Sequence, residues 1–175
     1  MKLTVLAALV AASAAFAQDP PKPGKEHERL KQHEGTWDAK AKFTFAPGQP
    51  PSESTGHYVA KMGGGGLWLL DDYKGTLAGS TFEGHGVATW DAAKKKYVFS
   101  WIDSMSCHIS VGEGDEDGEG NIVSSWEEKG PDGKTQKVKH VMSPVVKDAW
   151  TYRFLVVGDD GKETEMGIIS YTRKK

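Results

Sequence analysis

Apolar and polar side chains alternate strictly along residues 37–45. Trp37, Ala39, Ala41, Phe43 and Phe45 are separated by Asp38, Lys40, Lys42 and Thr44. Because successive side chains of a β-strand point to opposite faces of its sheet, this pattern predicts a strand with one dry and one wet face. A similar alternation in residues 150–156 predicts a second strand of this kind near the end of the chain.

Ten extended segments follow one another at steps of roughly ten to fifteen residues, a spacing typical of β-sandwiches and barrels. They are residues 36–45, 55–62, 67–74, 81–90, 96–103, 106–112, 121–128, 135–142, 149–157 and 164–173. Short turn sequences rich in Pro, Gly and Asp separate them, which favours a meander. Closing the sheet would remove its exposed edges. The sequence therefore predicts an all-β protein, with residues 25–175 forming a single antiparallel up-and-down β-barrel of about ten strands.

The first part of the chain has a different character. Residues 25–34 favour a short, mostly polar helix that Gly35 ends, and we expect it to cap one end of the barrel. Residues 18–24 contain three prolines and predict an extended spacer. Residues 1–17 carry Lys2, an apolar run and a final Ala15-Phe16-Ala17, the pattern of a signal peptide. We therefore expect cleavage after Ala17 and a periplasmic or secreted protein with no transmembrane segment.

Charge and cysteine content narrow the function classes. Removing the leader deletes Lys2 and no acidic residue, so the formal charge changes from −2 to −3. This near balance argues against a nucleic-acid partner. Cys107 is the only cysteine, so the chain cannot form an internal disulfide and must be held together by packing.

The Gly35-Thr36-Trp37 opening and the late Arg173 resemble those of lipocalin-like barrels. In such folds the tryptophan plugs the closed end and the basic side chain lies across its ring. The chain from about Leu30 onward also resembles a bacterial protein family of unknown function. The similarity runs through Phe82-Glu83-Gly84-His85-Gly86, Trp101-Ile102-Asp103-Ser104-Met105 and the Tyr171-Thr172-Arg173 ending. It implies a fold, and no activity comes with it.

One cluster of residues has the chemistry for acid–base catalysis. Asp103 and His108 flank a predicted hairpin turn, and His85 lies two strands earlier. A carboxylate beside an imidazole can orient it for proton transfer, whereas Asp and Ser in a turn more often bond backbone amides. Cys107 and His108 are adjacent on a predicted strand and point to opposite faces, so they do not form a nucleophile and base pair. A buried packing role suits this cysteine better.

The six histidines have no spacing that presents two nitrogens to one metal ion, so no metal site is predicted. His140 lies between Val138 and Met142 on one strand face and is the best candidate to ligate haem, as in nitrobindin-type barrels. A hydrogen-bonded core histidine is the simpler interpretation. No cofactor is therefore predicted, with haem kept as an alternative. The acidic residues 112–118 are interpreted as a solvated hairpin tip, without a full calcium ligand set.

Several aromatic residues have the character of a ligand-binding wall. The candidates are Phe99, Trp101, Trp126, Met142, Trp150 and Tyr152. A barrel of this size either is filled by its side chains or holds one small ligand. Our leading hypothesis is non-catalytic binding of a small apolar or amphipathic molecule, with the barrel open near residues 63–66. A haem protein or acid–base enzyme, and a filled barrel with a structural or interaction role in the cell envelope, are the alternatives.

Overall fold

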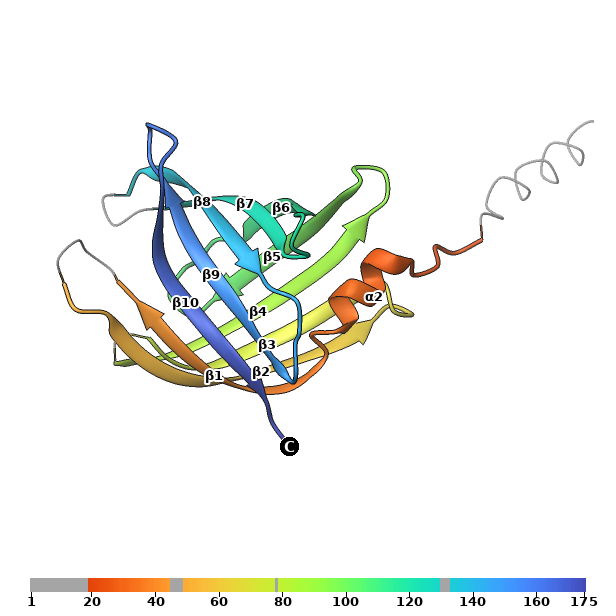
Figure 1. Ribbon diagram of the computed structural model, residues 1–175, viewed down its shortest axis with the longest axis horizontal. Coiled ribbons are helices and arrows are strands. Elements are labelled where there is room, and N and C mark those ends of the chain that lie inside the picture. Colours follow the sequence, from red (N-terminus) through yellow and green to blue (C-terminus); the bar gives the residue numbers. More distant parts are fainter. Residues whose placement is uncertain (1–18, 45–48, 78, 130–132) are drawn as a thin grey trace, which may run out of the picture.

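The computed structural model describes residues 19–44, 49–77, 79–129 and 133–175, so the predicted signal peptide lies outside the described residues. In these described residues, ten antiparallel strands form a closed barrel in the order β1-β10-β9-β8-β7-β6-β5-β4-β3-β2, and one short helix precedes them (Figure 1). The elements are α2 (Lys25–Lys31), β1 (Gly35–Phe43), β2 (Ser52–Gly63), β3 (Trp68–Leu77), β4 (Ser80–Asp91), β5 (Lys96–Asp103), β6 (Ser110–Glu116), β7 (Ile122–Lys129), β8 (Thr135–Met142), β9 (Ala149–Val157) and β10 (Glu163–Arg173). The predicted all-β barrel with a short N-terminal helix is confirmed. Among the described residues, no helix is both long and apolar enough to cross a membrane.

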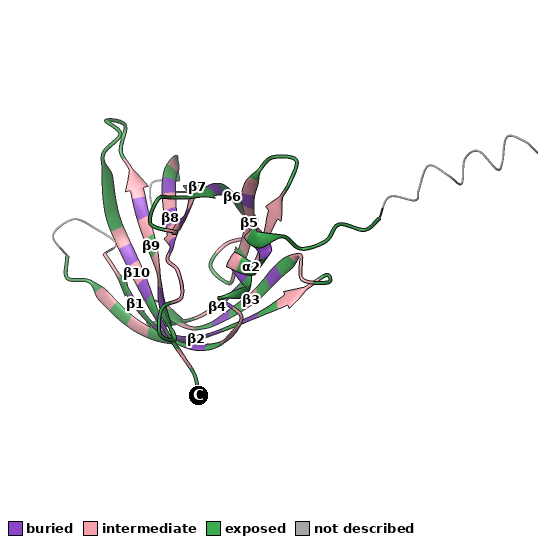
Figure 2. Ribbon diagram, turned by 45° about the vertical axis from the view of Figure 1, so that its right-hand side comes forward, coloured by how far each residue is buried: buried purple, intermediate pink, exposed green. Residues whose placement is uncertain are grey.

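The alternation of β1 places its apolar side chains inside the barrel. Trp37, Ala39 and Ala41 are buried, and the residues between them are exposed. Figure 2 shows the same alternation of buried and exposed residues along β10. The period of two seen in the sequence is therefore the inside and outside of one closed sheet.

The first and last strands close the barrel against each other, with Trp37 opposite Arg173. The Arg173 guanidinium lies 4.0 Å from the centre of the Trp37 ring. It also donates hydrogen bonds to the Glu34 carbonyl at 2.8 Å and to Asp148 Oδ1 at 2.9 Å. The expected contact between the plug tryptophan and the late basic residue is thus present, and hydrogen bonds at this end anchor it.

Helix α2 lies at this same end of the barrel (Figure 1). Leu30 and His33 are fully buried there, and the Trp37 indole donates to the His33 carbonyl at 2.9 Å. The His33 Nε2–H donates to the Ser143 carbonyl at 3.0 Å. Burial lowers the pKa of His33 to about 4, so this imidazole is neutral at physiological pH. We call this the closed end.

The prediction that the barrel opens near residues 63–66 is wrong. These glycines join β2 to β3 at the closed end, where α2 lies, because β2 runs from the opposite end toward it. Gly64, Gly65 and Gly66 all have positive φ values, so the glycines serve a tight turn. The loops of the open end follow β1, β3, β5, β7 and β9.

Strand β6 begins at Ser110, four residues later than expected. Asp103 Oδ1 accepts a hydrogen bond from the Met105 amide at 2.8 Å, which starts a loop over residues 104–109. The acidic residues that follow continue the strand to Glu116, because Lys94 and Lys96 pair with Glu113 and Asp115 across it. The hairpin tip expected over residues 112–118 therefore begins only at Asp117.

Candidate ligand cavity

The barrel encloses a cavity of about 500 Å³ between the aromatic cluster of the closed end and the open-end loops. Its walls include all six residues expected to line a ligand cavity, which are Phe99, Trp101, Trp126, Met142, Trp150 and Tyr152. Further aromatic residues line it as well, among them Phe43, Tyr58, Tyr73, Phe82, Phe154 and Tyr171. The barrel is therefore hollow, although its inward face is rich in large rings.

Inward-facing glycines explain why these rings do not fill the barrel. A β-carbon at Gly112 would lie 2.3 Å from the Trp126 ring, and one at Gly84 would lie 2.1 Å from Trp101. The Phe43 ring likewise occupies the space that a β-carbon would take at Gly167, its partner on β10. Each ring takes up volume at the wall that a β-carbon would otherwise occupy. The centre of the barrel is left open as a result.

The end of the cavity nearest α2 is a packed aromatic cluster. Trp150 stacks on Tyr171 with ring centres 3.9 Å apart and an angle of 10° between the planes. Tyr58, Trp37 and His33 meet Trp150 edge to face at 5.5, 6.0 and 4.7 Å. These contacts form the floor of the cavity and separate it from the closed end.

One wall of the cavity carries a polar group centred on His140 of β8. Its Nδ1 lies 3.1 Å from the Tyr152 hydroxyl, and its Nε2 lies 3.4 Å from Glu128 Oε1. The imidazole is buried and packs on Trp126 and Phe154 with ring centres 4.8 and 4.7 Å away. The Trp126 indole in turn donates to Ser124 Oγ at 2.7 Å. His140 thus faces the interior, as its position in the sequence predicts.

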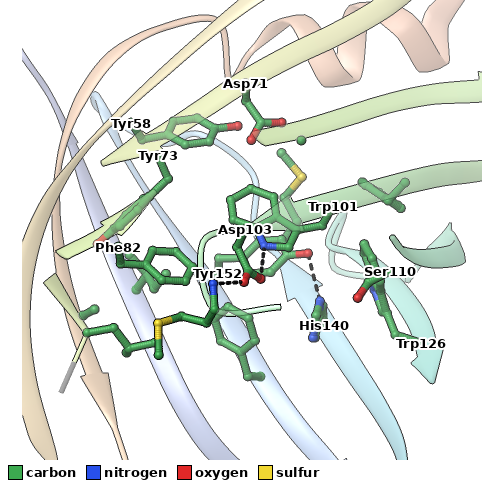
Figure 3. Close-up of a pocket in the computed structure, with 18 of the residues that line it drawn as sticks. Tyr58, Asp71, Tyr73, Phe82, Trp101, Asp103, Ser110, Trp126, His140 and Tyr152 are labelled. Carbon is green, nitrogen blue, oxygen red and sulfur yellow. Dashed lines mark hydrogen bonds between the residues drawn. The ribbon is translucent and has the colours of Figure 1, made fainter. Parts of the chain in front are cut away.

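The opposite wall carries a carboxylate that sequence analysis missed. Asp71 lies on β3, five strands away from β8 in the ring of ten. It lines the cavity, and Figure 3 shows its carboxylate beside the hydroxyl end of Tyr58. A β-carbon at Gly86, on the neighbouring strand, would lie 2.4 Å from an Asp71 oxygen. A larger residue at position 86 would force the carboxylate to move from this position.

Burial raises the pKa of Asp71 from its ordinary value of 3.8 to about 7. The nearby Asp72 adds to the rise, and His85 opposes it. No residue that the structure describes donates a hydrogen bond to the Asp71 carboxylate. Burial, together with the field of Asp71, also raises the pKa of the Tyr58, Tyr152 and Tyr171 hydroxyls, which lie around it. Asp71 is therefore an acid inside the barrel that faces aromatic side chains and accepts no hydrogen bond from a described residue.

The sequence contains a signal for Asp71. In β3 the inward positions are Leu69, Asp71 and Tyr73, and the outward positions are Leu70 and Asp72. Counting in steps of two from the inward Tyr73 puts one carboxylate of the Asp71-Asp72 pair inside. This signal is easily overlooked, because Leu69 and Leu70 place an apolar residue on each face of the strand. The sequence alone then does not show which face is buried, and Asp71-Asp72 looks like a polar break in the strand.

The three candidates for acid–base catalysis do not come together in the cavity. Asp103 and His108 line the open end, but Asp103 accepts a hydrogen bond from the Trp101 indole at 3.1 Å and caps the loop. His85 lies on the outer face of β4 and pairs with Asp72. Cys107, expected to be buried, is exposed in the loop after Asp103, because the strand expected around it begins only at Ser110. Within the described part of the chain, no group of three His, Cys, Asp or Glu side chains is placed to hold a metal ion.

Comparisons with known proteins support the fold and leave the ligand open. A family model described as "Protein of unknown function (DUF1579)" matches residues 22–173. A comparison with curated proteins finds no significant match. Among solved structures, the chain is similar to Rv2717c from M. tuberculosis, with a TM-score of 0.59 and 13% sequence identity. That similarity covers 87% of this chain and 99% of the other, and at this identity it concerns the fold alone.

Proposed function

The chain belongs to the DUF1579 family of proteins of unknown function, and from its cavity we propose that it binds a small, largely apolar or amphipathic molecule inside the barrel without catalysing a reaction. The observation that carries this proposal is the hollow, aromatic-lined interior. Its volume of about 500 Å³ lies within the usual range for small-molecule sites. Most of its wall is apolar, and polar groups that face it, such as Asp71, Glu128 and His140, are of the kind that orient a ligand.

The hollow interior also weighs against a filled barrel that acts through its surface. A filled barrel predicts no cavity, and the inward glycines keep this one open. Val59, Leu70, Ile102 and Val111 are exposed on the outer face. Single exposed apolar residues are common on protein surfaces and do not by themselves indicate a partner.

Haem binding at His140 is the second candidate, because this imidazole is buried and its Nε2 has no hydrogen-bond partner among the described residues. The same nitrogen lies 3.4 Å from Glu128 Oε1, so ligation of iron would require Glu128 to move away. The side chains as they stand therefore do not fit a haem ligand at this position. An absorbance spectrum of the purified protein tests this directly, since bound haem gives a Soret band.

Native mass spectrometry of the protein purified from its source organism tests the proposal. We expect a mass above that of the polypeptide, lost on denaturation and identifying the class of ligand. Titration with 1-octanol, followed by tryptophan fluorescence, supplies a second readout because Trp101 and Trp126 line the cavity. A polypeptide mass alone, together with no fluorescence response to octanol, would contradict the proposal.

A pair of neighbouring substitutions distinguishes the cavity from the surface. Ala41 points into the cavity, whereas Lys42 is on the outer face of the same strand. We expect Ala41→Phe to weaken octanol binding by about tenfold or more because the new ring takes up ligand volume, while Lys42→Phe leaves it unchanged. Equal effects of the two variants would place binding elsewhere.

A further inference from the structure

Asp71 is difficult to explain as a structural residue. Ionising a buried carboxylate without a hydrogen-bond donor is unfavourable, and proteins normally pair such a group. Here β3 places it inside the barrel, Gly86 leaves space for it, and no described residue donates to it. The cavity is the space that its oxygens face (Figure 3). A donor that completes this site would therefore come from a bound molecule.

The other cavity acids differ from Asp71 in already having partners. Asp103 accepts hydrogen bonds from the Trp101 indole and the Met105 amide. Glu128 lies 3.4 Å from the His140 imidazole, near the open end of β7. Of the three acids that line the cavity in the described part of the chain, Asp71 alone has neither a hydrogen-bond donor nor an ion-pair partner.

The charge balance of the cavity disfavours an anionic group near Asp71. Its described lining contains the acids Asp71, Asp103 and Glu128, the single permanently basic residue Lys129, and the histidines His108 and His140. Lys129 is the last residue of β7 and lies at the open end, far along the barrel from the floor. A fatty acid or another organic anion that entered charged group first would bring its charge toward Asp71 without a basic residue to receive it.

The aromatic residues around Asp71 favour a cation. The field of its carboxylate reaches the buried hydroxyls of Tyr58, Tyr152 and Tyr171, and Tyr73 and Trp101 line the same part of the cavity. Aromatic ring faces attract an ammonium group, and more strongly when the site is desolvated. An acid within a set of rings is thus suited to an amine carried on an apolar body.

We propose that the ligand of this cavity is a protonated amine with an apolar aliphatic or aromatic body, and that Asp71 is its counter-ion. This inference rests on the proposed binding function and specifies its ligand class. The ammonium group donates hydrogen bonds to the Asp71 oxygens and lies against the surrounding rings. The apolar body extends along Phe99 and Trp126 toward the open end.

Three probes of equal chain length separate charge from size. Octylamine, 1-octanol and octanoate are titrated into the mature protein at pH 8 by calorimetry, with tryptophan fluorescence as a second readout. We expect octylamine to bind about 10- to 100-fold more tightly than octanol, the range for a hydrogen bond to a charged group. Octanoate is expected to bind more weakly than octanol, because Asp71 repels it.

Two neighbouring variants attribute the preference to one residue. Asp71→Asn should remove the advantage of octylamine over octanol while octanol still binds. Asp72→Asn is the matched control, since Asp72 is the next residue on β3 and pairs with His85 on the outer face. It should retain the preference for the amine.

The outcomes distinguish the two proposals. If none of the probes binds, the proposed binding function fails and this inference fails with it. If octanol and octylamine bind the wild type equally, or Asp71→Asn keeps the preference, the cavity binds apolar molecules but Asp71 does not select an amine. Preferential binding of octanoate would overturn the inference outright.

Discussion

Replacing Asp71 by asparagine should stabilise the protein at alkaline pH and have little effect in acid. The folded protein holds the Asp71 proton up to a pH of about 7, whereas the unfolded chain releases it near the ordinary value of 3.8. Between these values the folded state binds the extra proton, so the contribution of Asp71 to stability falls as pH rises and is lowest above 7. The asparagine side chain carries no charge, so the variant lacks this pH dependence.

The size of the effect follows from the pKa. A rise from 3.8 to about 7 sets an upper limit of about 4 kcal/mol, at about 1.4 kcal/mol for each pH unit. The carboxylate is partly exposed to a cavity that water can enter, which reduces this penalty. We therefore expect Asp71→Asn to raise the free energy of unfolding by about 1–3 kcal/mol at pH 8 and by less than about 0.5 kcal/mol at pH 4.

Urea unfolding at several pH values, followed by tryptophan fluorescence, measures the difference between variant and wild type. The difference is the informative quantity, because His33 acts in the opposite direction over part of the same pH range. Asp72→Asn serves as the control: its side chain is exposed and forms a surface pair with His85, so its effect should stay small at every pH. Burial is the main cause of the raised pKa of Asp71, and of the charged groups Asp72 adds to the rise while His85 opposes it, so the small change in the control reports the share of Asp72.

An equal gain at pH 4 and pH 8 would refute the reasoning, because it would show that packing, and not charge, causes the change. A loss of stability at pH 8 would also refute it, since the carboxylate would then have a partner that stabilises it. If the expected gain is found together with loss of amine binding, the site exchanges stability for ligand recognition, as functional sites commonly do.

Three further outcomes are expected. Gly112→Ala should lower the free energy of unfolding by about 1–3 kcal/mol and weaken octanol binding, because the new β-carbon pushes Trp126 into the cavity; Gly118→Ala, with open space around it, should do neither. The neutral His33 should contribute a loss of about 3 kcal/mol between pH 6.5 and pH 4, which Asp71 opposes in the wild type. In urea titrations the free energy of unfolding of a His33→Gln variant should therefore rise by about this amount relative to the wild type over that range, and a constant difference between the two proteins would contradict the role of His33. Mass spectrometry of the periplasmic or secreted fraction should find a chain that begins after Ala17, and an intact leader there would contradict the predicted cleavage.

The fold was predictable because its main determinant is local. The alternation in β1 and β9 and the turn sequences between strands depend on neighbouring residues, so strand number and order follow from the chain itself. The start of β6 was misplaced because a side chain, Asp103, caps the preceding loop, and the segment around Cys107 resembles a strand in composition alone.

The residues that line the cavity could be predicted from the sequence, but the isolated carboxylate of Asp71 could not. The six lining residues could be named because side chains alternate between the two faces of a strand, so the sequence shows which ones point inward. Whether rings fill a barrel depends on the residue opposite, as with Trp126 and Gly112, and this pairing requires the register. The isolation of Asp71 is likewise a property of side chains from several strands and does not appear in one segment of sequence.

The pairing of β1 with β10 has a consequence for how the chain folds. Trp37 pairs with Arg173, near the other end of the chain, whereas every other strand pair joins sequence neighbours. Local hairpins form readily, and contacts between distant residues form late because they close the largest loop. Until β10 is available, β1 and β9 each present an unpaired edge that can capture another chain. A polypeptide that lacks β10 is therefore expected to aggregate, because pairing of these eleven residues, Glu163–Arg173, with β1 and β9 completes the barrel.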